Sequence, residues 1–178
     1  MKTTLLFTIC FFIGLGCASA DDIDARLVHY SGQIPSDSVL VRSVDSGAIA
    51  TSKTFSAKIA SNNSFSYDAI KQVEYPTDYD ADGKPDATEK RNTGITFTGS
   101  AILSEGTYNL DFKFHLNELK TTLFCPLEKQ NGIIVAQPVF REKELKTKTA
   151  VKLNNWVLFP LADEEDGSHV VMLLRIHK

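Results

Sequence analysis

Nine consecutive residues constrain the fold more than any other part of this sequence. From Tyr108 to Leu116, apolar side chains occupy every second position, and polar or charged side chains occupy the positions between them. A period of two is the period of a β-strand, whose side chains point alternately to opposite faces. The segment is therefore predicted to be a strand with one face on a core and the other in water.

Most of the remaining chain repeats this pattern or shows short apolar runs between turn residues. Residues 145–153 also alternate, and Val170–Ile176 is apolar almost throughout, which predicts a central strand covered on both faces. One short helix is predicted at Ser38–Val44, although this segment fits a strand nearly as well. The pattern predicts an all-β fold, a two-sheet antiparallel sandwich with at most one short helix. Other strands are expected at 26–30, 54–59, 64–69, 95–100, 122–125 and 133–136, with turns at 61–63, 105–106, 131–132, 154–155 and 166–167.

The first twenty residues are typical of a secretory signal. Lys2 precedes an apolar core at residues 5–13, and Ala18-Ser19-Ala20 forms a small-x-small cleavage site. We expect a signal peptide at residues 1–20 and one β-sandwich domain at residues 21–178. The alternative is cleavage before Cys17, whose surroundings resemble a bacterial lipoprotein box and would attach the protein to the outer membrane by lipid.

Charge and cysteine content narrow the function further. Removing Lys2 with the signal changes the formal charge from −3 to −4, which gives no reason to expect a nucleic-acid partner. Cys10 and Cys17 lie in the signal, so Cys125 is alone and cannot form an intrachain disulfide. We interpret Cys125 as a small buried residue beside Phe124, with a nucleophile or an intermolecular disulfide as alternatives.

An acidic stretch between residues 74 and 89 has the spacing of a calcium-binding loop. Alternate oxygen donors around a turn glycine, Gly83, can converge on one hard cation. The neighbouring sequence does not favour paired helices, because Pro76 would interrupt an entering helix. Two interpretations stay open: a structural calcium ion between strands, and a plain solvated turn without metal. Calcium is the one cofactor that the sequence suggests. The candidate ligands are Asp78, Asp80, Asp82, Lys84 through its carbonyl, Asp86 and Glu89.

A strand at 70–74 leads into a predicted turn at Tyr75-Pro76. Other segments precede and follow it, at 46–67, 94–99, 108–116, 138–161 and 170–176. In this order, over about residues 46–177, the segments resemble secretins, the outer-membrane pore subunits of type II secretion and type IV pilus machines. The resemblance implies a secretin-like sandwich. The chain also resembles a small immunoglobulin-like bacterial protein associated with type IV pili, which implies an immunoglobulin-like sandwich instead.

The chain departs from the secretin pattern in two places. Phe159-Pro160-Leu161 stands where the family has paired glycines, and residues 162–168 replace a long gate segment. The ring-forming amino-terminal domains are also missing from this sequence. The resemblance therefore implies a small exported relative, an accessory or scaffold part of such a machine, rather than a pore by itself.

Three lysines on one face of the strand 145–153 form a candidate interaction surface: Lys146, Lys148 and Lys152. Lysines on a strand also serve solubility and prevent edge-to-edge aggregation. Trp156 is expected at the rim of the core or within the core, with sugar stacking as the alternative.

We expect no enzyme, because the four histidines are dispersed and the sequence has no nucleophile elbow, phosphate loop or zinc motif. The predicted function is that of a non-enzymatic exported protein, located in the periplasm, at the outer membrane or on the cell surface. It would act within a type IV pilus or type II secretion apparatus through protein partners, with homo-oligomerisation as an option. The alternative is a secreted ligand- or glycan-binding adhesion module with a calcium-stabilised loop.

Overall fold

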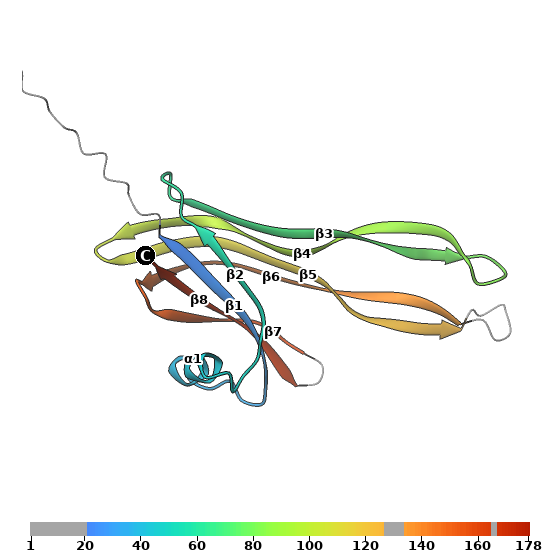
Figure 1. Ribbon diagram of the computed structural model, residues 1–178, viewed down its shortest axis with the longest axis horizontal. Helices are drawn as coiled ribbons and strands as arrows, with labels where there is room; N and C mark the ends of the chain where they lie inside the picture. Colours follow the sequence, from blue (N-terminus) through green and yellow to red (C-terminus); the bar gives the residue numbers. More distant parts are fainter. Residues whose placement is uncertain (1–20, 127–133, 165–166) are drawn as a thin grey trace, which may run out of the picture.

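The computed structural model describes residues 21–126, 134–164 and 167–178 (Figure 1). In these ranges, strands β2, β1, β8 and β7 form sheet 1, and β3, β4, β5 and β6 form sheet 2, each in that spatial order and antiparallel throughout. The predicted all-β two-sheet sandwich with one short helix is confirmed. The elements are β1 Asp22–Ser31, α1 Asp37–Asp45, β2 Thr51–Lys58, β3 Ser64–Tyr79, β4 Pro85–Ser104, β5 Thr107–Pro126, β6 Ile134–Lys152, β7 Trp156–Asp163 and β8 Ser168–His177.

The alternating segment 108–116 lies in β5 and behaves as predicted. Tyr108, Leu110, Phe112, Phe114 and Leu116 are all buried, because they face sheet 1 across the core. Rings from both sheets meet there. Phe97 lies 5.4 Å from Phe112 and 5.5 Å from Phe55, measured between ring centroids.

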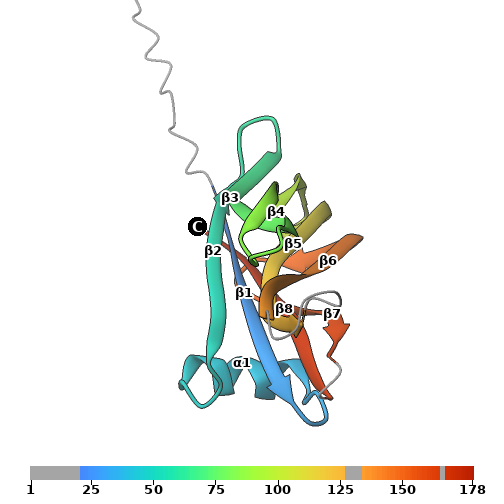
Figure 2. The ribbon, with the colours of Figure 1, turned by 90° about the vertical axis from the view of Figure 1, so that its right-hand side faces the viewer.

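Strand β8 is covered on both faces, as its apolar sequence predicts. Met172, Leu174 and Ile176 point into the core between the sheets, while Val171 and Leu173 belong to a second apolar cluster on the opposite face. That second cluster is closed by α1, which lies on the side of sheet 1 that faces away from sheet 2 (Figures 1 and 2). The predicted helix at 38–44 is therefore confirmed. It covers the face of β8 that points away from sheet 2.

Sheet 2 is much longer than sheet 1. Its strands have 16 to 20 residues, whereas those of sheet 1 have 8 to 10. Sheet 2 therefore projects well beyond the sandwich (Figure 1). In the projecting part it is no longer one sheet, because pairing of β4 with β5 ends at Gly94 and Asn117 while the two outer pairings continue. We call residues 70–93 the charged ribbon, and residues 119–126 with 134–140 the apolar ribbon.

Gly94 is the residue at which β4 leaves β5. Its φ of +134° lies in the region that L side chains rarely adopt. A Cβ at this position would lie 1.9 Å from the carbonyl oxygen of Ala69 on β3. The absence of a side chain at Gly94 therefore permits the close approach of β4 to β3 at the point where β4 leaves β5.

The turn expected at Tyr75-Pro76 is not there. Both residues lie within β3, and the chain reverses at residues 80–84 instead. Proline is tolerated because β3 is an edge strand of sheet 2, and the pairing with β4 shifts register between Pro76 and Asp78. Some predictions fall on residues outside the described ranges. The signal peptide and Cys17 lie wholly outside them, as does the turn at 131–132. The turn at 166–167 and the strand at 133–136 lie partly outside them.

Candidate functional site

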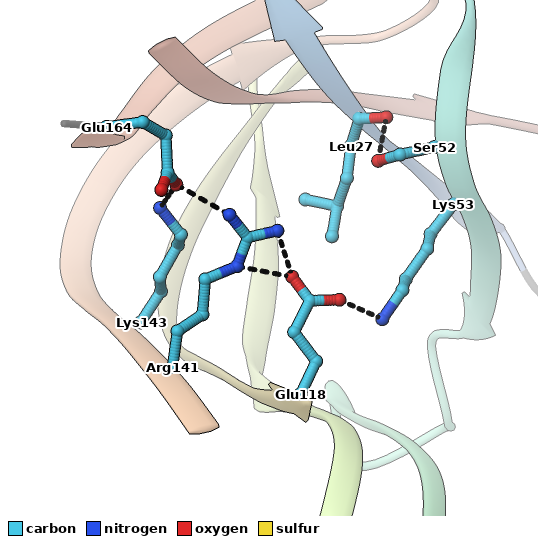
Figure 3. Close-up of polar contacts among 7 residues, drawn as sticks. All are labelled: Leu27, Ser52, Lys53, Glu118, Arg141, Lys143 and Glu164. Carbon is cyan, nitrogen blue, oxygen red and sulfur yellow. Dashed lines mark hydrogen bonds and ion pairs between the residues drawn. The ribbon is translucent and has the colours of Figure 1, made fainter. Parts of the chain in front are cut away.

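Five charged side chains form a network where the apolar ribbon leaves the sandwich (Figure 3). Glu118 on β5 accepts hydrogen bonds from Lys53 on β2 at 2.9 Å and from Arg141 on β6 at 2.8 Å. A second guanidinium nitrogen of Arg141 lies 2.9 Å from Glu164, which also pairs with Lys143. Lys53 and Glu164 come from the sheet 1 side and the other three from sheet 2. The network therefore fixes the base of the apolar ribbon to the sandwich.

Both carboxylates of this network are held in the ionised form. Burial acts to raise the pKa of Glu118, but the hydrogen bonds and charges of Lys53 and Arg141 outweigh it, so the pKa lies below its usual value. The same balance holds for Glu164: burial opposes ionisation, and Lys143 and Arg141 lower its pKa overall. Both carboxylates therefore carry their charges at neutral pH.

This network could not be found as a site from the sequence, because its members are far apart along the chain. One signal was present: Glu118 occupies the next inward position after Leu116 in the alternating strand. A carboxylate at a core position requires a partner. The sequence does not identify the partners Lys53 and Arg141.

The two ribbons contact each other along one face. Tyr75 on β3 packs against Phe140 on β6 at 5.2 Å between ring centroids, and Arg91 lies over the same phenylalanine at 4.7 Å. Near the tip, the hydroxyl of Tyr79 donates to the carbonyl of Ala136 at 2.6 Å. Each ribbon has only two strands, and an isolated two-stranded ribbon is marginally stable in water. These contacts are therefore part of what holds the projection in shape.

The apolar ribbon exposes large side chains on both of its faces. The exposed fractions are 47% for Leu119, 50% for Leu123, 73% for Phe124 and 65% for Ile134. Leu123 and Phe124 are neighbours on one strand and so point in opposite directions. Lys120 is the one charged residue in this ribbon. Such a concentration of exposed apolar surface is typical of a docking site.

The interpretation of Cys125 as a buried neighbour of Phe124 needs correction. Cys125 is partly exposed, and Phe124 is the most exposed of the large apolar residues in the described ranges. The local run Leu123-Phe124-Cys125 has core composition but lies beyond the end of sheet 1. No second sheet is there to cover it.

The structure distributes the candidate calcium ligands along a hairpin. Asp80, Asp82 and Lys84 lie in the turn, where one carboxylate oxygen of Asp80 accepts from the backbone N–H groups of Asp82 and Lys84. Asp78 is on β3, and Asp86 and Glu89 are on β4, where Glu89 accepts a hydrogen bond from the hydroxyl of Tyr75. Within the described ranges no group of three or more His, Cys, Asp or Glu side chains is close enough to hold a metal ion.

Calcium binding by this hairpin stays a prediction with a direct test. If the loop binds calcium, millimolar calcium should raise the melting temperature of the residue 21–178 protein, and a chelator should reverse the change. Asp80→Ala would also remove the two turn hydrogen bonds, so Asp82→Asn is the cleaner variant. Loss of the calcium response in Asp82→Asn, measured by circular dichroism, would support the site. An unchanged melting temperature in wild-type protein would exclude it.

The three candidate interaction lysines lie on the exposed face of β6, an edge strand of sheet 2. Lys146, Lys148 and Lys152 are all exposed. Lys148 pairs with Asp111 on β5 at 2.9 Å, and this hydrogen bond raises its pKa. The three lysines are therefore accessible on the protein surface, and the middle one, Lys148, is already paired with a carboxylate.

Trp156 lies at the rim of the second apolar cluster, as expected. The guanidinium groups of Arg26 and Arg175 each lie 4.6 Å from the centroid of its ring system. Arg26 also pairs with Asp45 of α1, and Arg175 with Asp24. The ring is thus engaged by two cations, and it also lines a cavity of about 340 Å³ with Asn154, Asn155 and residues of α1.

The histidines remain dispersed in the fold. His169 contacts Asp163 at 2.5 Å across the β7–β8 pair, and His177 lies 3.1 Å from Asp24. Hydrogen bonds to the carbonyl of Lys178 and to Asp24 raise the pKa of His177. In each pair a carboxylate lies beside an imidazole. The contacts described above add no third group that would complete a nucleophilic triad.

Comparison with known proteins gives solved structures that are partly similar to this chain. No family model matches the chain, and no curated protein matches it in sequence. The InvG secretin domain β-barrel from the Salmonella SPI-1 injectisome matches with a TM-score of 0.41 and 13% identity over 89% of this chain. The cryo-EM structure of the type III secretion injectisome secretin InvG and the basal-body structure of InvG, PrgH and PrgK each match with a TM-score of 0.38 and 12% identity. This chain spans 60% of the first two solved chains and 43% of the third.

One structural finding concerns membranes. Within the described ranges no helix is long and apolar enough to cross a bilayer.

Proposed function

We propose that this protein is a non-enzymatic, exported structural protein that docks within a type IV pilus or type II secretion apparatus. The observation that carries the proposal is the apolar ribbon, which projects from the sandwich and exposes Leu119, Leu123, Phe124 and Ile134. The order of secretin-like segments in the sequence supports the choice of machine. The export pattern of residues 1–20 supports the location in the periplasm, at the outer membrane or on the cell surface.

The ribbon is suited to docking for two physical reasons. Its exposed apolar side chains gain free energy when a partner removes them from water. Its strands also retain backbone N–H and C=O groups that can pair with a strand of another chain. The ion network at its base, centred on Glu118 and Arg141, holds the ribbon in position and reduces the ordering cost of binding. Partners can be other proteins of the machine or further copies of this chain.

A pair of matched variants tests this proposal. Phe124→Ser with Ile134→Ser removes exposed apolar surface from the ribbon, whereas Ile102→Ser with Leu103→Ser removes a similar area at the opposite end of sheet 2. Ile102 and Leu103 are 53% and 56% exposed. The wild type and the two double variants should melt at similar temperatures, because none of the four substituted side chains belongs to the core.

The measurement is affinity purification of the tagged protein from the envelope of its native host, followed by mass spectrometry. Components of a pilus or secretion machine should copurify with the wild type and with the Ile102/Leu103 variant, and should be reduced at least about tenfold with the Phe124/Ile134 variant, as a loss of about 1.4 kcal/mol would give. Light scattering after size exclusion will show whether further copies of the chain are among the partners. Equal recovery with all three proteins, or recovery of no such component, would contradict the proposal.

The adhesion alternative has its own test. A ligand- or glycan-binding module should retain specific saccharides on a glycan array in the presence of calcium. Retention lost in Trp156→Ala, with the fold intact, would favour that function over docking within a machine.

A further inference from the structure

A notch opens where β4 and β5 part at the base of the two ribbons. It is a cavity of about 420 Å³, walled by Thr93 and Gly94 on one side and by Asn117, Glu118 and Leu119 on the other. A wider groove of about 600 Å³ adjoins it and runs between β2 and β3. The two spaces share Lys53, Lys71 and Gly94 in their walls. The two spaces therefore adjoin at these three residues, at the base of the ribbons.

Asn117 brings an unused hydrogen-bond acceptor to this notch. Its side-chain nitrogen donates to the carbonyl of Asn92 at 2.8 Å and contacts a carboxylate oxygen of Glu142 at 3.3 Å. Both neighbours are acceptors, which fixes the orientation of the amide. The residue is only 7% exposed, and its Oδ1 has no hydrogen-bond partner among the described residues. A buried acceptor without a donor is costly, so a ligand that supplies an N–H would be favoured here.

The backbone of β5 offers a second set of unused groups. Its ladder with β4 ends at Asn117, while its ladder with β6 continues to Pro126. From Glu118 onward, β5 therefore has one edge without a ladder partner in the described structure. Such an edge accepts an added strand through main-chain hydrogen bonds.

The charges around the notch are mixed, with Glu118 in its wall and Asp68 in the adjoining groove, and the cation that stands apart from them is Lys71. Lys53 and Lys71 both line it, and Lys53 already pairs with Glu118. Lys71 is exposed, and no described residue forms an ion pair with it. A carboxylate entering the notch would meet the free ammonium of Lys71 without displacing an existing pair.

We propose that the notch binds an extended segment of a partner protein, which adds a strand to the free edge of β5 and places an Asp or Glu carboxylate on Lys71. A backbone N–H of the segment pairs with Asn117 Oδ1 once the atoms that leave this oxygen with less than 1 Å² of accessible surface have moved aside. One peptide segment supplies three groups: an amide donor for Asn117, a strand edge for β5 and a carboxylate for Lys71. This site lies at the base of the ribbons and does not rest on docking by the exposed tip of the apolar ribbon.

The probe is a nine-residue peptide, acetylated and amidated, in which valine and threonine alternate around one central aspartate. It is titrated into ¹⁵N-labelled protein of residues 21–178, and amide chemical shifts are followed by NMR, which detects weak binding. Saturable shifts are expected at Gly94, Leu119 and Thr121. The affinity should fall about fivefold when the central aspartate is replaced by asparagine, and about tenfold in Lys71→Glu.

Two variants serve as controls. Lys146→Glu changes an exposed lysine on β6, and Phe124→Ser with Ile134→Ser changes the ribbon tip; both should bind the peptide as the wild type does. The tip variant separates this proposal from the proposed function, because either can fail without the other. Three outcomes would overturn the notch proposal: unchanged affinity in Lys71→Glu, shifts confined to other strands, or equal shifts produced by sodium acetate, which would indicate a simple anion site.

Discussion

Gly94→Ala is expected to lower the free energy of unfolding by about 3 kcal/mol, more than most single substitutions in this protein. Two costs add. The φ of +134° is unfavourable for any residue with a Cβ. The added methyl group would also lie 1.9 Å from the carbonyl oxygen of Ala69, and backbone atoms can move away only by disturbing the pairing of β3 with β4.

The measurement is urea denaturation followed by circular dichroism, with Gly106→Ala as the matched control. Gly106 also has a positive φ, of +77°, but a Cβ there would meet nothing within 4 Å. Its substitution should cost only about 1 kcal/mol, which is the conformational part alone. The difference between the two variants reports the contact with Ala69 together with the greater strain of a φ of +134°. Equal effects would show that neither the close approach of β4 to β3 nor this strain matters for stability.

Glu164→Ala is expected to destabilise the protein by about 3 kcal/mol, because it leaves the buried ammonium of Lys143 without its carboxylate. The Lys143 side chain is only 5% exposed and that of Glu164 13% exposed. Arg141 loses one of its two partners in the same variant. By contrast, Glu144→Ala removes an exposed pair with Lys113 and should change stability by no more than about 0.5 kcal/mol.

Two further measurements distinguish charge from packing at this position. The double variant Glu164→Ala with Lys143→Met should recover much of the lost stability, because no charge is then left buried. The pH dependence follows from the lowered pKa values of Glu118 and Glu164. Their contribution is complete above the usual carboxyl pKa and is lost as the pH falls through the lower folded-state values. If the double variant were no more stable than Glu164→Ala, the network would not be the cause.

The sequence predicted those parts of the fold that depend on local periodicity. The alternation of 108–116 identified β5 and its buried face, and the apolar run 170–176 identified β8 as a central strand. The helix was predicted to within one residue at each end, Ser38–Val44 against Asp37–Asp45. In each case the residues themselves carry the period that the structure uses.

The candidate site could not be predicted in the same way, because it depends on contacts between distant residues. Nothing local shows that Lys53, Glu118 and Glu164 meet. The composition of 123–125 indicated a core position, yet sheet 1 ends before reaching it. Pro76 suggested a turn, but an edge strand accommodates it. The extent of each sheet, the edge position of a strand and the contacts between distant residues are all tertiary properties, which local sequence patterns do not specify.

The pairing of β1 with β8 has a consequence for the order of folding. Strands β3 to β6 pair only with their sequence neighbours and can form as successive hairpins while the chain is still incomplete. Sheet 1 cannot, because its two central strands, β1 and β8, are the first and the last strands of the described residues. A nascent chain therefore keeps the apolar inner face of sheet 2 uncovered until β8 has emerged. This is an aggregation hazard during synthesis, and C-terminal truncations that remove β8 should be insoluble rather than merely less stable.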